Sequence, residues 1–554
     1  MRNVRFVLAG CAVVALLGGT IPAVADTPGY IETSTSDPVT AAPPVSQPDT
    51  SSCTVRLADK FPSNAPDGSQ QYFSGTLAPP QACPGPWAKV VLTETISVSG
   101  RQFDRVGSLR IGDTDVYWGT TEEPSGPNPT TYTFSKDITE YTALLQHTQP
   151  YRGGIGNYTS DVYTGNYLQT VDITYYSADR RHPAPRTPDM VVGLGDSGLS
   201  PGTPSVTHTL SDLPRNITRA YLEVTLEGGG CDEQWFDDVP DAVSAQYPSA
   251  GLCGHGPYRE ADVILDGAPV AAVHTFPYIY SGGIVPTLWR PIPAIGTFDL
   301  TPETVDVTPF VGTLVDGGSH DLTTSVQNIG DGWTVVETLL LYTDHHAAQT
   351  HGALLTDSVA PTATEQVDVS PVDGGTKIVD STARHDVTSG YVIGSAGRIT
   401  TTVTRDMQYR NTDTVTDSGL TQSVRQSDTG RQTSVSSRHG RTVAATRHAY
   451  DYPLAVDYSA ANYVDDQNFS LDGTVNMTRT LADFAAGHGR NWRQTYGSTE
   501  NVDSYGIEAR TNGVTTTTDG HSTSFFRGDD DLGRFYAHYL ASDHGLITED
   551  IVRR

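Results

Sequence analysis

Basic residues, cysteine and long apolar runs are all scarce in this sequence. Its 554 residues include 35 lysines and arginines against 64 aspartates and glutamates. Because a strongly acidic chain repels phosphate backbones, this balance argues against nucleic acid as a partner. The one apolar run, near the N-terminus, is too short to cross a bilayer and no other stretch could cross one, so we expect no membrane partner beyond the cleaved signal.

The N-terminus has the pattern of an export signal. Arg2 and Arg5 precede an apolar run at 6–17, and small residues follow at 23–25. This order predicts a signal peptide over residues 1–25, whose removal releases a secreted chain. The segment Leu8–Cys11 imitates a lipoprotein cleavage box, but the apolar run continues past it, so we favour the signal peptide.

The few cysteines predict two disulfides. Removing the signal removes Cys11 and leaves Cys53, Cys83, Cys231 and Cys253. An even number in an exported chain indicates disulfides, and of the three connectivities the local one is favoured, Cys53 with Cys83 and Cys231 with Cys253. Metal binding is the alternative, but no C-x-x-C spacing supports it, so we expect no metal.

Two long segments have the alternation of β-sandwiches. Residues 52–180 and 190–347 consist of short runs of alternating apolar and polar residues, broken by turn residues. A proline-rich stretch at 182–188 separates them. Residues 26–51 are rich in proline, serine, threonine and aspartate and predict a disordered linker.

The last third of the chain has a different composition. Residues 375–554 are rich in threonine, serine, aspartate and arginine, again with alternation but with thin apolar content. This pattern predicts a β-rich C-terminal domain that leans on the others for its core. Only short helical stretches are expected, such as Ala482–Ala486, so the fold class is all-β.

Three motifs imitate reactive sites without the partners that such sites need. Gly195–Gly198 resembles the nucleophile loop of trypsin-like proteases, but nothing marks a base for Ser197, and we expect a turn. Asp344–His346 lacks metal-ligand spacing and is interpreted as a surface loop. Asp529–Asp531 lacks the spacing of a calcium loop and is interpreted as a solvated turn. No metal or organic cofactor is implied.

Two other segments combine acids with the side chains that could use them. Asp104 is followed by Arg105, whose charge favours the ionised carboxylate, although an ordinary strand-end ion pair has the same pattern. Residues 228–236 place Asp232, Glu233 and two aromatic residues after a glycine run that allows a tight turn. Because aromatic faces stack on sugar rings, the segment could bind a sugar. The alternative is a structural loop without a binding role, held in place by Cys231.

The same segments carry a resemblance to a known family. Seven segments carry it, Phe103–Gly107, Trp118–Pro124, Val162–Tyr167, Pro257–Ala261, Gly282–Ile284, Leu288–Leu300 and Gly533–Tyr536. In these segments the sequence resembles the PNGase A family, strongly over about residues 50–345 and weakly to the C-terminus. Among these, Leu288–Leu300 is the longest and most specific. The sequence departs from family members at Gln234–Phe236 and adds the Cys231 and Cys253 pair.

A fainter resemblance to PNGase F implies the arrangement of the domains. That enzyme has two packed jelly-roll sandwiches with its site in the groove between them, which implies jelly rolls at 52–180 and 190–347 here. Its catalytic aspartate segment is similar to the one around Asp104. Its second essential carboxylate matches Glu233, and its third acid falls near Asp161.

The resemblance implies hydrolysis of the amide bond between asparagine and the first N-acetylglucosamine of N-glycosylated peptides and proteins. Asp104 would orient or deprotonate the attacking water, or attack directly. Arg105 would keep Asp104 ionised and donate to the oxyanion. Glu233 would bind the first sugar and help to protonate the leaving nitrogen.

Further residues are implied in substrate binding. Asp161 is the candidate third acid, Trp235 and Trp289 are candidate stacking walls for sugars, and Arg290 is a candidate contact for glycan or carbonyl. Two other functions remain open, a glycosidase acting on N-glycans and a non-catalytic glycan-binding protein. The sequence gives no indication of oligomeric state.

Overall fold

A computed structural model describes most of the chain. It covers residues 37–63, 71–124, 129–161, 163–460, 462–464, 468–487, 492–512 and 514–554. The predicted signal peptide lies outside these residues. Within them, no helix combines the length and the apolar character that a membrane crossing requires.

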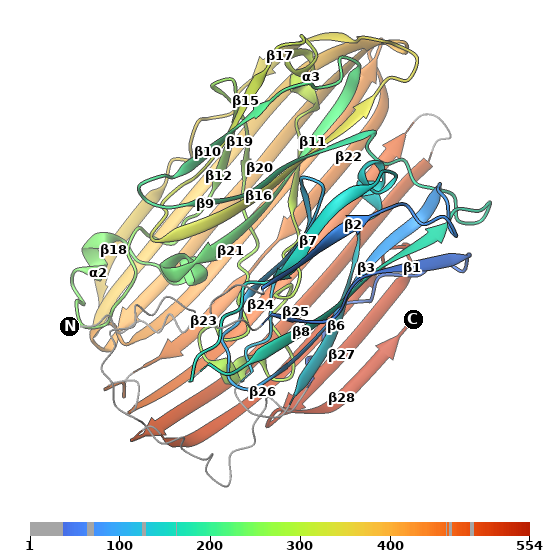
Figure 1. Ribbon diagram of the computed structural model, residues 1–554. Helices are drawn as coiled ribbons and strands as arrows, with labels where there is room; N and C mark the ends of the chain where they lie inside the picture. Colours follow the sequence, from blue (N-terminus) through green and yellow to red (C-terminus); the bar gives the residue numbers. More distant parts are fainter. Residues whose placement is uncertain are drawn as a thin grey trace.

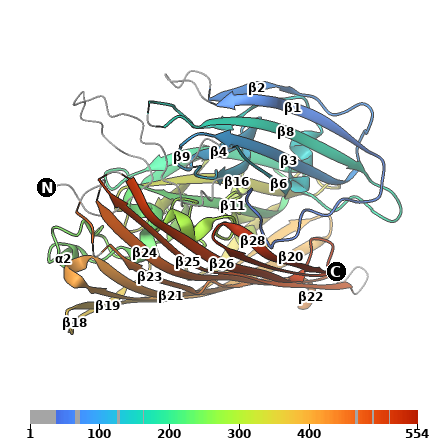
Figure 2. The same cartoon turned by 90° about the horizontal axis from the view of Figure 1, so that it is seen from below.

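The first sandwich packs two four-stranded antiparallel sheets (Figures 1 and 2). Burial alternates over Thr93–Val98 of β3, and apolar side chains such as Val90 and Leu92 form the core between the sheets. One sheet has the order β1 (Ser52–Ser63), β8 (Asn166–Ser177), β3 (Trp87–Ser99) and β6 (Thr130–Asp137); the other has the order β2 (Tyr72–Leu77), β7 (Gln149–Ile155), β4 (Val106–Ile111) and β5 (Thr114–Thr120).

The second sandwich has the same construction. Its sheets are β14 (Glu303–Asp306), β11 (Ile217–Gly229), β16 (Gly332–Thr343) and β9 (Met190–Leu199), and β10 (Ser205–Leu210), β15 (His320–Val326), β12 (Ala261–Leu265) and β13 (Ala268–Val273). Strand β9 brings it against the first sandwich at Gly193, where a Cβ atom would lie 2.0 Å from the carbonyl oxygen of Asp113. Glycine therefore permits this close approach.

A twelve-stranded sheet forms the C-terminal part of the described chain, and Figure 2 shows it as a broad layer with the sandwiches on one side. The predicted all-β architecture of two packed jelly rolls and a β-rich C-terminal domain is confirmed. The strand order of the twelve-stranded sheet is β17 (His351–Asp357), β19 (Gly375–Gly394), β20 (Gly397–Thr416), β21 (Thr421–Arg438), β22 (Arg441–Asp451), β24 (Phe469–Gly487), β25 (Trp492–Thr511), β26 (Val514–Asp529), β27 (Phe535–Asp543) and β28 (Leu546–Arg553). Beside this path, β18 (Gln366–Val372) pairs with β19, and β23 (Leu454–Ser459) pairs with β21 and β24. The residue boundaries of independently folding domains stay a prediction.

Helices are short connections in the described chain. The α-helices are α1 (Thr142–Leu145), α2 (Asp241–Ser244) and α3 (Val311–Leu314), and the 3₁₀ helices are η2 (Thr139–Tyr141), η3 (Gly230–Asp237), η4 (Pro286–Trp289), η5 (Thr308–Phe310) and η6 (Asp417–Gly419). The prediction of a helix at Ala482–Ala486 is wrong, because these residues belong to β24 and pair with residues 493–497 of the neighbouring strand β25. The turn expected at Gly195–Gly198 is also wrong, since these residues belong to β9 and pair with β16.

The linker predicted as disordered over 26–51 is ordered where the structure describes it. Ala41 is buried in a cluster with Ile292, Phe526 and Tyr536. The N–H of Val39 donates to the carbonyl of Pro291 at 2.9 Å. The small apolar residues of this polar segment thus pack against an apolar surface of the folded domains. We call residues 37–51, which lie along this surface, the strap.

The acidic turn at Asp529–Asp531 anchors this strap instead of being simply solvated. Asp531 accepts hydrogen bonds from the N–H of Ser46 and pairs with the ammonium of Lys89. Asp530, which is largely buried, accepts from the hydroxyl of Ser46 at 3.3 Å. The turn therefore joins the strap, the first sandwich and the C-terminal sheet.

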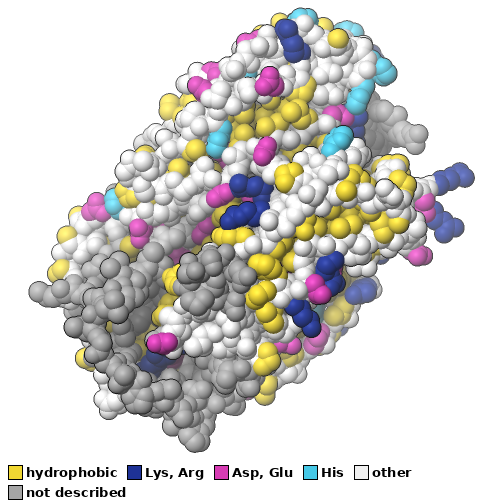
Figure 3. Space-filling model, viewed as in Figure 1, with side chains coloured by type: hydrophobic (Ala, Val, Ile, Leu, Met, Phe, Trp, Pro, Cys, Tyr) yellow, Lys and Arg dark blue, Asp and Glu magenta, His cyan; other side chains and the backbone are white. Residues whose placement is uncertain are grey.

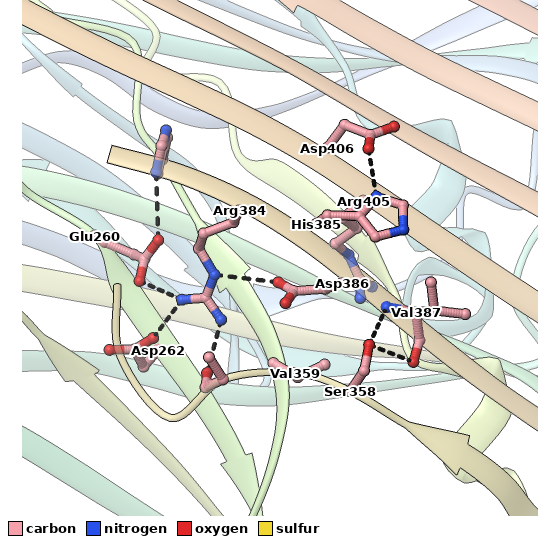
Figure 4. A network of polar contacts seen from close by, with 12 residues as sticks. Glu260, Asp262, Ser358, Val359, Arg384, His385, Asp386, Val387, Arg405 and Asp406 are labelled. Atoms are coloured by element: carbon pink, nitrogen blue, oxygen red, sulfur yellow. Dashed lines mark hydrogen bonds and ion pairs between the residues drawn. The ribbon is translucent and has the colours of Figure 1, made fainter. Parts of the chain in front are cut away.

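A buried ionic network holds the second sandwich to the C-terminal sheet (Figure 4). Arg384 of β19 donates to Glu260 at 2.5 Å, to Asp262 at 3.2 Å and to Asp386 at 3.2 Å. Glu260 also faces His274 at 3.3 Å. Burial alone would raise the pKa of Glu260, but the His274 and Arg384 contacts lower it to about 2. Glu260 is therefore an ionised acid that depends on its cationic partners.

The outer surface is mixed in charge. On the face in Figure 3, acidic and basic side chains are scattered, and apolar side chains surface in several patches between them. The formal charge of −29 is thus not gathered into a single acidic patch on this face.

Candidate active site

Asp104 and Arg105 lie in the loop between β3 and β4, where the two sandwiches meet. The loop is fixed to the end of β5, because the N–H of Arg105 donates to Thr121 Oγ1 at 2.9 Å and the N–H of Thr121 donates back to the Arg105 carbonyl at 2.9 Å. Asp104 Oδ2 accepts from the N–H of Gly282 at 3.2 Å. The catalytic candidate is thus held by both sandwiches.

The Arg105 guanidinium is largely buried and points along the same loop. Its Nη2 donates to Gln102 Oε1 at 2.5 Å, and its carbon lies 4.3 Å from the centre of the Tyr158 ring. Its Nε atom is buried and has no hydrogen-bond partner among the described residues. This N–H is a donor that a bound oxyanion could use.

A pair of acids, Glu122 and Glu123, follows β5 and lies close enough to Asp104 for its charge to act on both. Arg290 donates to Glu122 Oε1 at 3.3 Å and to the carbonyl of Glu123. A Cβ atom on Gly282 would lie 1.8 Å from Glu123 Oε2. The Glu123 carboxylate occupies the space that a side chain at position 282 would fill, and the Asp104 carboxylate accepts from the N–H of the same residue. Glycine at 282 therefore allows both carboxylates to converge there.

The second sandwich contributes Glu227 from β11 and Glu233 from η3. The Trp118 Nε1 donates to Glu227 Oε2 at 3.4 Å across the junction of the sandwiches. Glu233 is buried, and the charges of Asp104, Glu123 and Glu227 all act on it. The predicted acids Asp104 and Glu233 therefore do belong to one cluster.

Asp232, next to Glu233, has a structural environment. It is fully buried and accepts from the backbone N–H groups of residues 330–332 and from Arg259 Nε at 2.8 Å. The disulfide Cys231–Cys253, with Cα atoms 5.8 Å apart, ties the same loop. The second disulfide, Cys53–Cys83, has Cα atoms 6.0 Å apart, and both predicted pairings are confirmed.

The acids of the cluster differ in their affinity for protons. Burial raises the pKa of Asp104 to about 6, although the Gly282 N–H and the charges of Arg105 and Arg290 oppose this rise. Burial and the charge of Asp104 raise the pKa of Glu123 to about 8. Burial, followed by the charges of Asp104 and Glu123, raises the pKa of Glu233 well above its ordinary value. At neutral pH, Asp104 is therefore mostly ionised and Glu123 mostly protonated, and Glu233 keeps its proton to a higher pH than an ordinary glutamate does.

The prediction that Trp235 and Trp289 stack on sugars is wrong, because both side chains are buried. Trp235 is 3% exposed and packs against Phe236 and Tyr409, and Trp289 is 1% exposed and donates from Nε1 to the Gly283 carbonyl at 2.8 Å. Stacking on a sugar requires an exposed ring face, which neither offers. Their apolar rings fill the core beneath the site instead.

Exposed aromatic and acidic groups lie on the loop between β7 and β8. Tyr158 is 48% exposed, and Tyr163 lies with its ring centre 4.4 Å from that of Phe103. Asp161 is exposed on the same loop and is not among the charges that shift the pKa of Asp104 or Glu233. The buried cluster thus does not include it, and its role as third acid stays a prediction.

Three acids of the cluster were not assigned from sequence. Glu122 and Glu123 stand within the matched segment Trp118–Pro124, so their position after a strand in a specific motif was an available signal. Glu227 stands near the end of β11, directly before the glycine run at 228–230, and no local pattern distinguishes it.

The fold and the cluster place this protein in the class of β-proteins with two packed sandwiches and a site of carboxylates and arginines where the sandwiches meet. Residues 40–359 match the family model described as peptide N-acetyl-beta-D-glucosaminyl asparaginase amidase A, and residues 381–454 match the PNGase A C-terminal domain. The chain belongs to this family, the PNGase A family.

A curated relative supports the same assignment. Peptide-N4-(N-acetyl-beta-glucosaminyl)asparagine amidase A of Prunus dulcis is 32% identical over 369 residues, which cover 63% of this chain and 64% of the relative. The match therefore spans less than two thirds of that relative's length.

Solved structures show a more distant likeness. PNGase F, a glycosylasparaginase from Flavobacterium meningosepticum, is 15% identical with a TM-score of 0.35, and the match covers 53% of this chain and 96% of that one. PNGF-II is 13% identical with a TM-score of 0.37, over 53% of this chain and 66% of that one. At these scores the likeness adds nothing to the family assignment.

Proposed function

We propose that this protein is a secreted peptide-N-glycanase, which hydrolyses the amide between asparagine and the first N-acetylglucosamine of N-glycosylated peptides and proteins. The observation that carries the proposal is one ionised aspartate, Asp104, set beside arginines and proton-holding acids in a member of the PNGase A family. The signal-like N-terminus and the two disulfides support secretion.

The cluster contains the groups that this hydrolysis needs. Asp104 takes a proton from water as the water oxygen bonds to the amide carbon. The Arg105 Nε–H stabilises the negative charge that develops on the carbonyl oxygen. The carbon–nitrogen bond then breaks, and protonated Glu233 gives its proton to the leaving nitrogen. The products are aspartate and a glycosylamine.

One glycopeptide distinguishes this proposal from its rivals. After incubation with the protein, mass spectrometry of the peptide identifies the residue at the glycosylation site. Aspartate supports the amidase, asparagine that retains one N-acetylglucosamine indicates a glycosidase, and an unchanged glycopeptide indicates a binding protein.

Glu233→Gln should lower kcat by about 100-fold to 1,000-fold and raise KM less, because the amide keeps the shape but has no acidic proton to give. Steady-state kinetics on a labelled glycopeptide measure both constants. Asp232→Asn is the matched contrast. It weakens the buried contact with Arg259, so we expect lower thermal stability without a selective loss of kcat. An unchanged kcat/KM for Glu233→Gln would remove Glu233 from the chemistry.

The rate should depend on pH through two neighbouring acids. As pH rises through about 6, Asp104 ionises and kcat/KM increases. As pH rises through about 8, Glu123 ionises and places a second negative charge where the oxyanion forms, so kcat/KM falls. Glu123→Gln, which stays neutral, should keep the acid limb and move the alkaline limb upward. Identical profiles for the variant and the wild type would contradict this role.

A further inference from the structure

Strand β28 is the last strand of the C-terminal sheet, and it lies beside the marked C-terminus in Figure 1. It pairs with β27 on one side, and no described strand pairs with its other side. Seven of its eight residues are exposed, and residues 546–553 include no proline or lysine. Natural sheets protect open edges with charged side chains, lysine above all, with proline or with a covering segment, because an open edge invites another strand. Among these, β28 carries the charges of Glu549, Asp550 and Arg553.

An apolar row runs across the outer face of the sheet and stops at this edge. Phe525 of β26 is paired with Tyr539 of β27, which is paired with Ile551 of β28. They are 38%, 36% and 47% exposed, whereas their neighbours Phe526 and Leu540 point into the core. Ile551 therefore presents the end of an exposed apolar row to whatever pairs with the edge.

The charges of β28 have a self-complementary order around the same residue. Glu549 lies two residues before Ile551, and Arg553 lies two residues after it. All three point to one face, because they pair with Ala541, Tyr539 and Ala537 of β27. Two antiparallel copies of this strand, crossed at Ile551, would place Glu549 of each opposite Arg553 of the other. Opposite charges at such positions are favourable.

We propose that β28 pairs with β28 of a second copy of the chain, antiparallel and about a two-fold axis at Ile551. Two independent observations select this register, the apolar row that ends at Ile551 and the charges that match across it. In the dimer, the two apolar rows join into one across the interface, and the free edges satisfy each other's backbone groups.

Charge reversal tests the partner and the register together. Glu549→Arg and Arg553→Glu each set like charges opposite one another twice in the dimer, so each should weaken dimerisation at least about tenfold. The double swap Glu549→Arg with Arg553→Glu restores opposite pairs and should return the dissociation constant to near the wild-type value. Sedimentation equilibrium of the full chain, up to about 100 µM because the pairing surface is small, measures it.

A cysteine trap tests the position of the axis. Opposite residues of antiparallel strands have Cβ atoms about 4.5–5.5 Å apart, so Ile551→Cys in a Cys11→Ser background should form an intermolecular disulfide under mild oxidation. Thr548→Cys in the same background is the matched control and should not, because the axis separates the two copies of residue 548. Circular dichroism confirms that each variant is folded.

The proposal is overturned by a wild-type chain that is monomeric throughout the concentration range. It is also overturned by single reversals that leave the dimer intact, by a double swap that does not restore it, or by equal cross-linking of the two cysteine variants. None of these outcomes depends on the glycanase activity.

Discussion

Replacing Asp104 by asparagine should lower kcat by about 1,000-fold or more, because the amide cannot take a proton from water. The fold should survive, since asparagine can still accept from the Gly282 N–H at 3.2 Å. The pKa of Asp104 is raised in the folded protein, so its charged form opposes folding at neutral pH. The variant should therefore melt at the same temperature as the wild type or higher.

Asp113→Asn is the matched control for this experiment. Asp113 is exposed in the turn between β4 and β5 of the same sandwich, and its replacement should leave kcat and the melting temperature unchanged. Released glycan and calorimetry of both variants give the comparison. Wild-type activity in Asp104→Asn would exclude Asp104 as the base.

Replacing Arg384 by leucine should lower the free energy of unfolding by about 3–5 kcal/mol. The side chain is buried, and its loss leaves Glu260, Asp262 and Asp386 without their shared cation. The loss should be greatest where these acids are ionised, above the pKa of about 8 for Asp262, which burial and the Glu260 charge raise. Thermal and urea unfolding at several pH values measure it.

An exposed arginine of the same sheet gives the contrast. Arg425 on β21 pairs with Asp457 at 2.8 Å, but both side chains are about half exposed, 51% and 49%. Arg425→Leu should therefore change the free energy of unfolding by at most about 1 kcal/mol. Equal losses for the two variants would mean that the network in Figure 4 does not hold the C-terminal sheet to the second sandwich.

The sandwiches were predictable because their strands alternate between a buried and an exposed face. In β3, for example, Ile96 and Val98 are buried while Thr95 and Ser97 are partly exposed, and the alternation alone indicates a strand with one face in a core. The disulfides were predictable for a related reason. Cys53 with Cys83 and Cys231 with Cys253 are neighbours along the chain, and short loops close at low entropic cost.

Other features depend on contacts that local sequence does not contain. The strap around Ala41 is ordered only because Ile292 and Tyr536, hundreds of residues away, provide an apolar surface. Ala482–Ala486 has helix-forming alanines, but neighbouring strands on both sides impose extended backbone. Trp235 and Trp289 have the side chains of sugar-stacking residues, yet only the three-dimensional packing decides that they fill the core.

Only part of the site was predictable, because some of its residues stand in recognisable motifs and others come together only in the fold. Asp104 and Glu233 stand in motifs that resemble those of known amidases, whereas Glu227 stands on a plain strand. Glu123 becomes a neighbour of Asp104 only through the space that Gly282 leaves, which lies 159 residues further along the chain from Glu123. Burial raises both pKa values, and the charge of Asp104 adds to the rise for Glu123, so these values are a property of the fold rather than of any one motif.

Hydrolysis of one glycopeptide in water labelled with a heavy oxygen isotope tests the central claim most directly. If Asp104 activates water against the amide carbon, the former asparagine becomes aspartate with one heavy oxygen in its side-chain carboxylate, and the reducing end of the released glycan is first a glycosylamine. Mass spectrometry of the peptide and of the promptly trapped glycan detects both. Asparagine that still carries N-acetylglucosamine, with the heavy oxygen in the released sugar, would contradict the account.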